Sequence, residues 1–262
     1  MTKNFKLLAL TGLLSFVVGA NSFGATLKVG ATPVPHAEIL EAIKPELSKE
    51  GIDLKIVEFT DYVTPNLALN DGELDANFFQ HYPYLQKFAE ERKLNLVSAG
   101  AIHVEPLGLF SEKHKSLDEL KKGATVAIPN DPSNGGRALI LLHNNGIIKL
   151  ADPTNLYSTE FDIAENPKKL KFKSLEAAQL PRVLKDVDFA VINGNYAMEA
   201  NLNPTKDALV LEGKESPYAN IVAVRGKDLE KAEIKTLIKV LQSEKVADFI
   251  EEKYNGSVVK AF

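Results

Sequence analysis

The chain has 262 residues, of which 45% are hydrophobic and 25% charged, enough for one large or two ordinary globular domains. Its formal net charge is −4 and its basic residues form no long block, so we expect no nucleic-acid partner. The absence of cysteine excludes disulfides, thiol catalysis and a lipid attached to a cysteine side chain.

Residues 1–24 have the pattern of a signal peptide. Lys3 and Lys6 give a positive start, residues 7–18 form an apolar run, and small side chains precede a cleavage site before Ala25. The apolar run is shorter than the about 20 residues of a membrane helix, although an uncleaved anchor is the alternative. We therefore expect an exported, soluble, periplasmic protein whose signal peptide is removed.

The next segment predicts a β-α-β unit. Residues 27–31 form an apolar strand, residues 36–49 carry apolar side chains at helical spacing, and residues 54–59 form a second strand after Gly51. Two strands joined by a helix imply a parallel sheet with a right-handed crossover.

An aromatic-rich stretch follows between Asp61 and Leu85. Its pattern predicts a helix that ends near Gly72, then a short strand and a loop crowded with rings. Gln80 and Pro83 interleave the rings, which is poor chemistry for a fully buried strand. Rings at a strand end can wall a small-ligand pocket, although core packing is the commoner role of aromatic residues. The rings are those of Tyr62, Phe78, Phe79, His81, Tyr82 and Tyr84.

Strands and helices continue to alternate in the rest of the chain. Ser116 and Glu119 fit a capping box, and residues 153–167 are the expected long surface connection. Helices are expected at residues 82–92, 116–120, 137–144, 175–184, 196–200, 230–242 and 245–254. Strands are expected at residues 94–99, 107–110, 125–128, 170–173, 189–192 and 221–224.

Two sets of alternating elements, joined by an extended segment near Glu105, predict two α/β lobes. The simplest arrangement returns the last predicted strand and the terminal helices to the first lobe. The chain then crosses between the lobes twice, and a cleft lies between them. We expect lobe 1 to comprise residues 25–105 and 220–262, and lobe 2 residues 106–219.

The segment PNDPSNGGRALILL, residues 129–142, is a candidate anion site. Ser133 or Asn134 can cap the helix that follows, and the two glycines after them let a backbone approach a ligand. Free N–H groups and Arg137 at a helix start can bind a carboxylate. An ordinary glycine-rich turn with a surface arginine is an equal alternative on sequence alone.

Asparagines follow two later apolar segments. Asn193 and Asn195 come after the strand at residues 189–192, where binding side chains often lie, and Asn220 precedes the strand at residues 221–224. On sequence alone, ordinary turn residues are the better interpretation of all three.

No catalytic or metal motif is evident. The spacing of the five histidines matches no zinc pattern, and GxSxG, P-loop and GxGxxG motifs are absent, so we predict no catalytic residue, metal site or cofactor. The histidines are His36, His81, His103, His114 and His143.

Several long motifs in one order resemble the NlpA/MetQ family of methionine-binding receptors. They are DYVTPNLALNDGELDANFFQHYPYL, SLDEL, VAIPNDPSNGGRALILL, ENPKKLKF, EAAQLPR, VINGNYA and KESPYANIVAVR, and the resemblance covers essentially the whole mature chain. It implies a two-lobed periplasmic-binding-protein fold of type 2, each lobe a mixed sheet flanked by helices, with ligand in the interlobe cleft.

The resemblance also implies roles for individual residues. Arg137 would pair with the ligand carboxylate, and Asn193 and Asn220 would bind its polar end. The rings that would enclose its side chain are Tyr62, Phe79, His81 and Tyr84.

The resemblance implies a receptor, not an enzyme, that delivers L-methionine to an ABC permease at the inner membrane, and we expect a monomer. D-methionine, a methionine-containing dipeptide and another small amino acid are alternative ligands, and an exported enzyme with His81 as base is a remote one. Many family members carry a lipid on a cysteine, whereas this chain has no cysteine, so it resembles the freely soluble members or else is tethered in another way.

Overall fold

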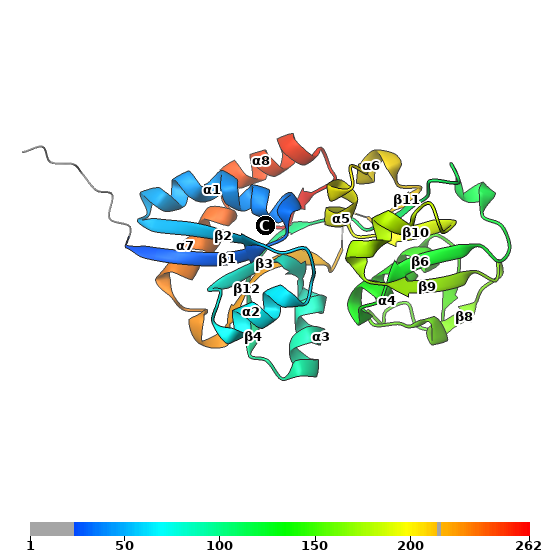
Figure 1. The fold of residues 1–262 in the computed structure, drawn as a ribbon, viewed down its shortest axis with the longest axis horizontal. Coiled ribbons are helices and arrows are strands. Elements are labelled where there is room, and N and C mark those ends of the chain that lie inside the picture. Colours follow the sequence, from blue (N-terminus) through cyan, green and yellow to red (C-terminus); the bar gives the residue numbers. More distant parts are fainter. Residues whose placement is uncertain (1–23, 214–215) are drawn as a thin grey trace, which may run out of the picture.

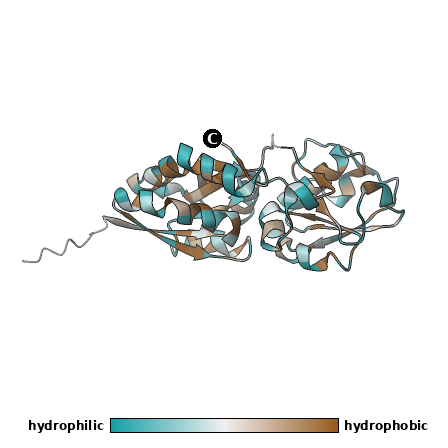
Figure 2. Ribbon diagram, turned by 90° about the horizontal axis from the view of Figure 1, so that it is seen from above, coloured by the Kyte–Doolittle hydropathy of each residue, from teal (hydrophilic) through white to brown (hydrophobic). Residues whose placement is uncertain are grey.

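The computed structural model describes residues 24–213 and 216–262, and it has two α/β lobes arranged along its longest axis (Figure 1). The predicted signal peptide therefore lies outside the described residues, except for Gly24. Figure 2 shows mostly hydrophobic strands inside each lobe and helices with mixed faces around them. Among the described residues, no helix is both long and apolar enough to cross a membrane.

Lobe 1 is built on a six-stranded mixed sheet with the order β13-β4-β12-β3-β1-β2. The strands β1 and β2 pair in parallel, as predicted, and β12 is antiparallel to both β3 and β4. The strands are β1 (Ala25–Ala31), β2 (Ile52–Glu58), β3 (Ala76–His81), β4 (Leu96–Val104), β12 (Ala219–Arg225) and β13 (Val259–Lys260).

Helices cover both faces of this sheet because its strands are apolar on both sides. In β12, Val222 and Val224 join one core cluster, whereas Ile221 and Ala223 join another, as the two-residue strand period requires. The first cluster includes side chains of α1 (Glu38–Lys49), α7 (Ala232–Leu241) and α8 (Glu244–Tyr254); the second includes those of α2 (Thr64–Asp71) and α3 (Tyr82–Arg92).

Lobe 2 is built on a five-stranded sheet with the order β11-β5-β10-β6-β9. Its helix α4 (Pro132–Asn144) packs on one face, and the turn at Ala177–Val183 and helix α5 (Gly194–Glu199) pack on the other. A small helix α6 (Pro204–Asp207) lies beyond α5. The strands are β5 (Gly108–Phe110), β6 (Thr125–Pro129), β9 (Lys171–Leu175), β10 (Phe189–Ile192) and β11 (Val210–Leu211), and the pair β7 (Lys149–Leu150) and β8 (Ile163–Glu165) is separate.

A central strand of lobe 1 comes from the late part of the chain. Strand β12 lies between β3 and β4, so the chain leaves lobe 1 after β4 and returns before β12. This topology supports the predicted lobes, 25–105 with 220–262 and 106–219, whose limits stay a prediction.

The prediction that the aromatic rings lie in a loop after a short strand is wrong. Strand β3 runs to His81, all six of its residues are buried, and α3 begins directly at Tyr82. The strand tolerates polar side chains because Asn66, Asn77 and Gln80 hydrogen-bond to one another at 2.8–3.0 Å.

The predicted start of α4 is also wrong. The helix begins at Pro132, and Asp131 is its cap, because its carboxylate accepts the Asn134 backbone N–H at 2.9 Å. Neither Ser133 nor Asn134 caps the helix, and Arg137 lies in its second turn. Proline at the first helical position and an aspartate before it are the usual start signals.

The glycines after Asn134 do not open the backbone to a ligand. A Cβ atom on Gly136 would collide with the carbonyl oxygen of Leu156, so the glycine admits the neighbouring loop of lobe 2.

The short elements of lobe 2 differ most from expectation. The predicted capping box is absent: the Ser116 side chain makes no cap bond, and Glu119 instead accepts the Lys115 backbone N–H at 3.2 Å. The helix expected at residues 175–184 is a 3-10 turn, since Pro181 cannot donate a helical hydrogen bond. The expected surface connection at residues 153–167 contains the strand β8.

Candidate functional site

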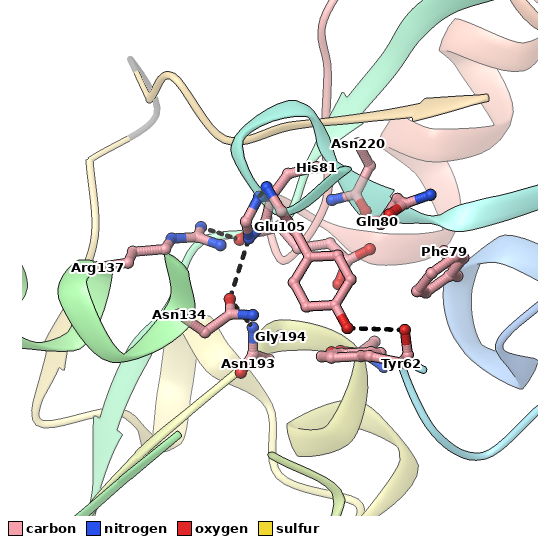
Figure 3. A pocket seen from close by; sticks show the side chains of 12 residues that line it. Tyr62, Phe79, Gln80, His81, Glu105, Asn134, Arg137, Asn193, Gly194 and Asn220 are labelled. Carbon is pink, nitrogen blue, oxygen red and sulfur yellow. Dashed lines mark hydrogen bonds between the residues drawn. The ribbon is translucent and has the colours of Figure 1, made fainter. Parts of the chain in front are cut away.

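A small cavity lies between the lobes and is lined from both sides (Figure 3). All seven predicted ligand-binding residues line it: Tyr62, Phe79, His81, Tyr84, Arg137, Asn193 and Asn220. Five further residues do so as well: Gln80, Glu105, Asn134, Gly194 and Asn195. The structure thus brings the predicted residues together, although it does not test their contact with a ligand.

Aromatic rings of lobe 1 form one wall. The ring centroid of Tyr62 lies 5.9 Å from those of Phe79 and Tyr84, distances typical of packed aromatic pairs. The Tyr84 hydroxyl donates to the Tyr62 backbone carbonyl at 2.8 Å, which orients the Tyr84 ring. Phe78 lies in the core cluster of lobe 1 and Tyr82 is half exposed, so neither lines the cavity.

Arg137 is buried and already has a carboxylate partner. Its Nε donates to Glu212 Oε1 at 3.0 Å, and its Nη2 pairs with Glu212 Oε2 and donates to the Glu105 carbonyl at 2.8 Å. The Tyr218 ring centroid lies 4.4 Å from its Cζ. Burial lowers the pKa of Arg137, but the Glu212 carboxylate outweighs it and the pKa is raised. Within the described chain, Nη1 donates to no protein atom, so it can bind a ligand.

The Asn134 side chain hydrogen-bonds to residues of both lobes. Its Oδ1 accepts from Asn193 Nδ2 at 2.8 Å and faces His81 Nε2 at 3.0 Å, while its Nδ2 donates to both Asp131 oxygens. Since an acceptor faces Nε2, that nitrogen carries the His81 proton, and Nδ1 accepts the Tyr84 N–H at 3.2 Å. Burial and then the Arg137 charge lower the pKa of His81 to about 3, so the ring is neutral at physiological pH.

Two asparagine atoms in the cavity lack partners. In residues 24–213 and 216–262, Asn193 Oδ1 and Asn195 Nδ2 are buried without a hydrogen bond, although Asn195 Oδ1 accepts from the Tyr62 hydroxyl at 2.6 Å. Buried polar groups are nearly always paired, so one free acceptor and one free donor indicate a ligand that supplies both complements.

Glu105 is a charged cavity residue that the sequence reasoning missed. It lines the cavity and is 5% exposed, and its Oε1 lies 3.2 Å from His36 Nε2 and 2.7 Å from His103 Nε2. Burial raises the pKa of Glu105, and it lowers those of His36 and His103 to about 4 and about 3. The sequence signal that could have identified Glu105 is an acidic residue directly after an apolar strand.

A profile of the NlpA lipoprotein family matches residues 27–262. This chain belongs to the NlpA lipoprotein family.

Named relatives of this NlpA-family chain agree with that assignment. The D-methionine-binding lipoprotein MetQ of Escherichia coli K12 is 44% identical over 90% of this chain and 88% of its own length. A nutrient-binding protein of Burkholderia cenocepacia, solved bound to methionine, is 51% identical with a TM-score of 0.87, covering 90% of this chain and all of that one. An ABC-transporter periplasmic substrate-binding protein of Coxiella burnetii is 45% identical with a TM-score of 0.86, over the same shares.

These likenesses confirm the predicted two-lobed binding-protein fold for this NlpA-family chain. Relatives named lipoproteins point to a place outside the cytoplasm, whereas none of the 262 residues here is cysteine.

Proposed function

We propose that this protein is an extracytoplasmic receptor that captures methionine and delivers it to an ABC permease. The proposal rests on one observation above all: an interlobe cavity that places an aromatic wall beside a buried guanidinium, a buried carboxylate and two unpartnered amide atoms. The names of its relatives, which print methionine and D-methionine as ligands, support the same conclusion.

The polar groups suit a zwitterion. The ligand carboxylate would lie at Arg137 Nη1 and Asn195 Nδ2, which donate to no atom of residues 24–213 and 216–262, and the ammonium at the acceptors Glu105 and Asn193 Oδ1. Each buried charge of the ligand would then meet an opposite charge and a hydrogen-bond partner, which offsets its desolvation.

The apolar wall suits a thioether. Tyr62, Phe79 and Tyr84 present ring faces and edges to the cavity, and a sulfur–aromatic contact stabilises by about 0.3–1.5 kcal/mol. Norleucine, which has a methylene in place of the sulfur, should therefore bind more weakly than methionine.

The site is proposed to bind and not to convert its ligand. His81, the one base considered, is neutral but uses Nε2 to donate to Asn134 and Nδ1 to accept from Tyr84, so no lone pair remains for proton transfer. Ligand recovered unchanged after long incubation would agree with this, and a product would refute it. We propose a soluble periplasmic monomer whose closed lobes dock on the permease.

Calorimetry after unfolding and refolding, which strips carried-over ligand, tests the proposal. L-methionine should bind tightly, and methionine amide and N-acetylmethionine, each lacking one charge, should bind at least about tenfold more weakly. Titrations with D-methionine and glycyl-methionine decide between the alternative ligands. A refolded protein that binds none of these would overturn the proposal.

Variants locate the binding in this cavity. Asn193→Ala should weaken L-methionine binding by about 1–3 kcal/mol, because a buried partner of the ligand is removed. Asn203→Ala, a change in the exposed cap of α6, is the matched control and should leave the affinity unchanged. Equal affinities of the two variants would place the ligand elsewhere.

A further inference from the structure

A compact group of nitrogen and oxygen donors adjoins the cavity and shares Glu105 with it. Among the described residues, His36, His103 and Glu105 form the one group of histidine and acidic side chains whose ligand atoms all lie within 4.8 Å of one another. We propose that these three side chains bind a transition-metal ion of the Zn²⁺ class, with Asn220 Oδ1 as a fourth ligand.

The donor atoms lie close to one another. Glu105 Oε1 lies 2.7 Å from His103 Nε2 and 3.2 Å from His36 Nε2, and Asn220 Oδ1 lies 3.1 Å from His36 Nε2. Two imidazoles and a carboxylate are a common zinc set that leaves one position open, whereas Ca²⁺ and Mg²⁺ prefer oxygen ligands alone.

Rigid elements hold these donors. His103 lies on β4 and Asn220 on the neighbouring β12, where the two residues are paired in register, and Glu105 directly follows β4. His36 comes from the turn before α1, and its Nδ1 lies 2.7 Å from the Thr32 hydroxyl, the kind of outer contact that orients a metal-binding imidazole. The site would therefore need little reorganisation to bind an ion.

The local charge favours a cation. The three donor residues are at most 5% exposed, and the Glu105 carboxylate lies against the two imidazoles, with no lysine or arginine side chain of the described residues paired to it. The Arg137 guanidinium pairs with Glu212 and donates to the Glu105 backbone, not to its carboxylate. A buried carboxylate without a full countercharge is costly, and an ion at the imidazoles would supply that charge.

The site shares two residues with the ligand cavity. Glu105 and Asn220 line the cavity (Figure 3), whereas His36 and His103 are not among its lining residues. Metal binding is thus measurable without any amino acid present.

Metal titration of the untagged, chelator-treated chain tests the proposal. Zn²⁺ alone should bind at one equivalent per chain by calorimetry and raise the melting temperature, while Ca²⁺ and Mg²⁺ should do neither. Co²⁺ should give the visible absorption of a four-coordinate nitrogen and oxygen site. Absence of Zn²⁺ binding and of a Co²⁺ spectrum in the folded wild-type chain would overturn the proposal.

Variants assign the ligands. His103→Gln and Glu105→Gln should each weaken Zn²⁺ binding by more than about tenfold. His114→Gln is the matched control, because His114 also contacts two acids, Glu119 and Asp188, at 3.3 Å but lies outside this cluster. Loss of binding in His114→Gln with none in Glu105→Gln would reject the assigned site, and the Co²⁺ spectrum of the wild type decides if a variant fails to fold.

The outcome is separate from that of the methionine proposal. L-methionine is titrated into the chelator-treated chain, and Zn²⁺ into the ligand-stripped chain. Methionine binding without Zn²⁺ binding removes only the metal site, and the reverse result removes only the methionine receptor.

Discussion

At the scale of single residues, the Arg137 guanidinium is already paired with a carboxylate of the protein, that of Glu212. The family resemblance implied that this side chain pairs with a ligand carboxylate, yet Glu212 already accepts from its Nε and Nη2. The pair is almost buried, with side chains 3% and 16% exposed, so its charges are poorly screened. A ligand carboxylate would therefore approach a guanidinium whose charge is largely balanced.

We predict that Glu212→Gln tightens L-methionine binding about tenfold, or about 1.4 kcal/mol. The amide oxygen can still accept from Arg137 and hold it in place, while the competing negative charge disappears. Calorimetry measures the effect, and methionine amide, which has no carboxylate, should gain nothing. A weaker affinity would mean instead that Glu212 positions the guanidinium.

Glu199, the last residue of α5, is a partly buried carboxylic acid. Its Oε1 has no partner among the described residues, and burial, then the charge of Glu105, raises its pKa to about 7. The folded state thus holds a proton that the unfolded state releases near pH 4.5. The proton on Glu199 therefore contributes to the free energy of unfolding. This contribution is complete below the unfolded pKa and is lost as pH rises from about 4.5 to about 7.

We predict that Glu199→Gln removes this pH dependence and raises the free energy of unfolding at pH 8 by on the order of 1 kcal/mol, allowing for solvent screening. Denaturant titrations at pH 4.5, 6 and 8 measure it. Glu252→Gln, on the exposed face of α8, is the control and should keep the wild-type pH profile. Parallel profiles for Glu199→Gln and wild type would contradict the prediction.

At the scale of elements, the start of α4 organises the lobe 2 side of the cavity. The Asp131 carboxylate caps the helix through the Asn134 N–H and also holds the Asn134 side-chain amide. That amide in turn presents its oxygen to His81 and Asn193. One cap thus serves both helix stability and the geometry of the cavity.

We predict that Asp131→Ala lowers the free energy of unfolding by about 0.5–2 kcal/mol, the usual cost of a lost cap, and also weakens methionine binding. Ser133→Ala, which removes only a hydroxyl donating to Asp131 at 3.0 Å, should cost less in both measurements. Denaturant unfolding and calorimetry provide the two values. Equal losses in the two variants would argue against the cap.

At the scale of the whole molecule, four hydrogen bonds join the two lobes around the cavity. Three involve a tyrosine hydroxyl and one a histidine ring, with lengths of 2.6–3.2 Å: Tyr62 with Asn195, Tyr196 with Thr60, Tyr157 with Pro83, and His81 with Asn134. Each net hydrogen bond stabilises by about 0.5–1.5 kcal/mol, so together they favour the closed arrangement.

We predict that the double variant Tyr62→Phe and Tyr157→Phe opens the ligand-free protein, which X-ray scattering would register as a larger radius of gyration. Methionine affinity should fall about tenfold, since part of the binding energy must then close the lobes. Tyr254→Phe is the control, because its hydroxyl bonds Glu38 within lobe 1 at 2.6 Å. Unchanged scattering from the double variant would show that other contacts hold the lobes together.

Much of the fold could be predicted because its signals are local. Apolar spacing located β1, α3 and β10 to within two residues, and the family motifs named seven residues that line one cavity. Short turns were predicted less well: the capping box at Ser116 and the start of α4 depended on which of several polar side chains captured the free N–H groups.

The amino-acid sequence by itself determined the alternation of strands and helices, the family and the residue types of the cavity, because periodicity and motifs belong to neighbouring residues. Tertiary structure alone decided which distant groups meet: Arg137 with Glu212, and His36 with His103 and Glu105. It also decided that β3 is wholly buried, since its polar side chains find partners in Asn66. Burial and charge pairing are set by contacts between segments, which sequence spacing does not encode.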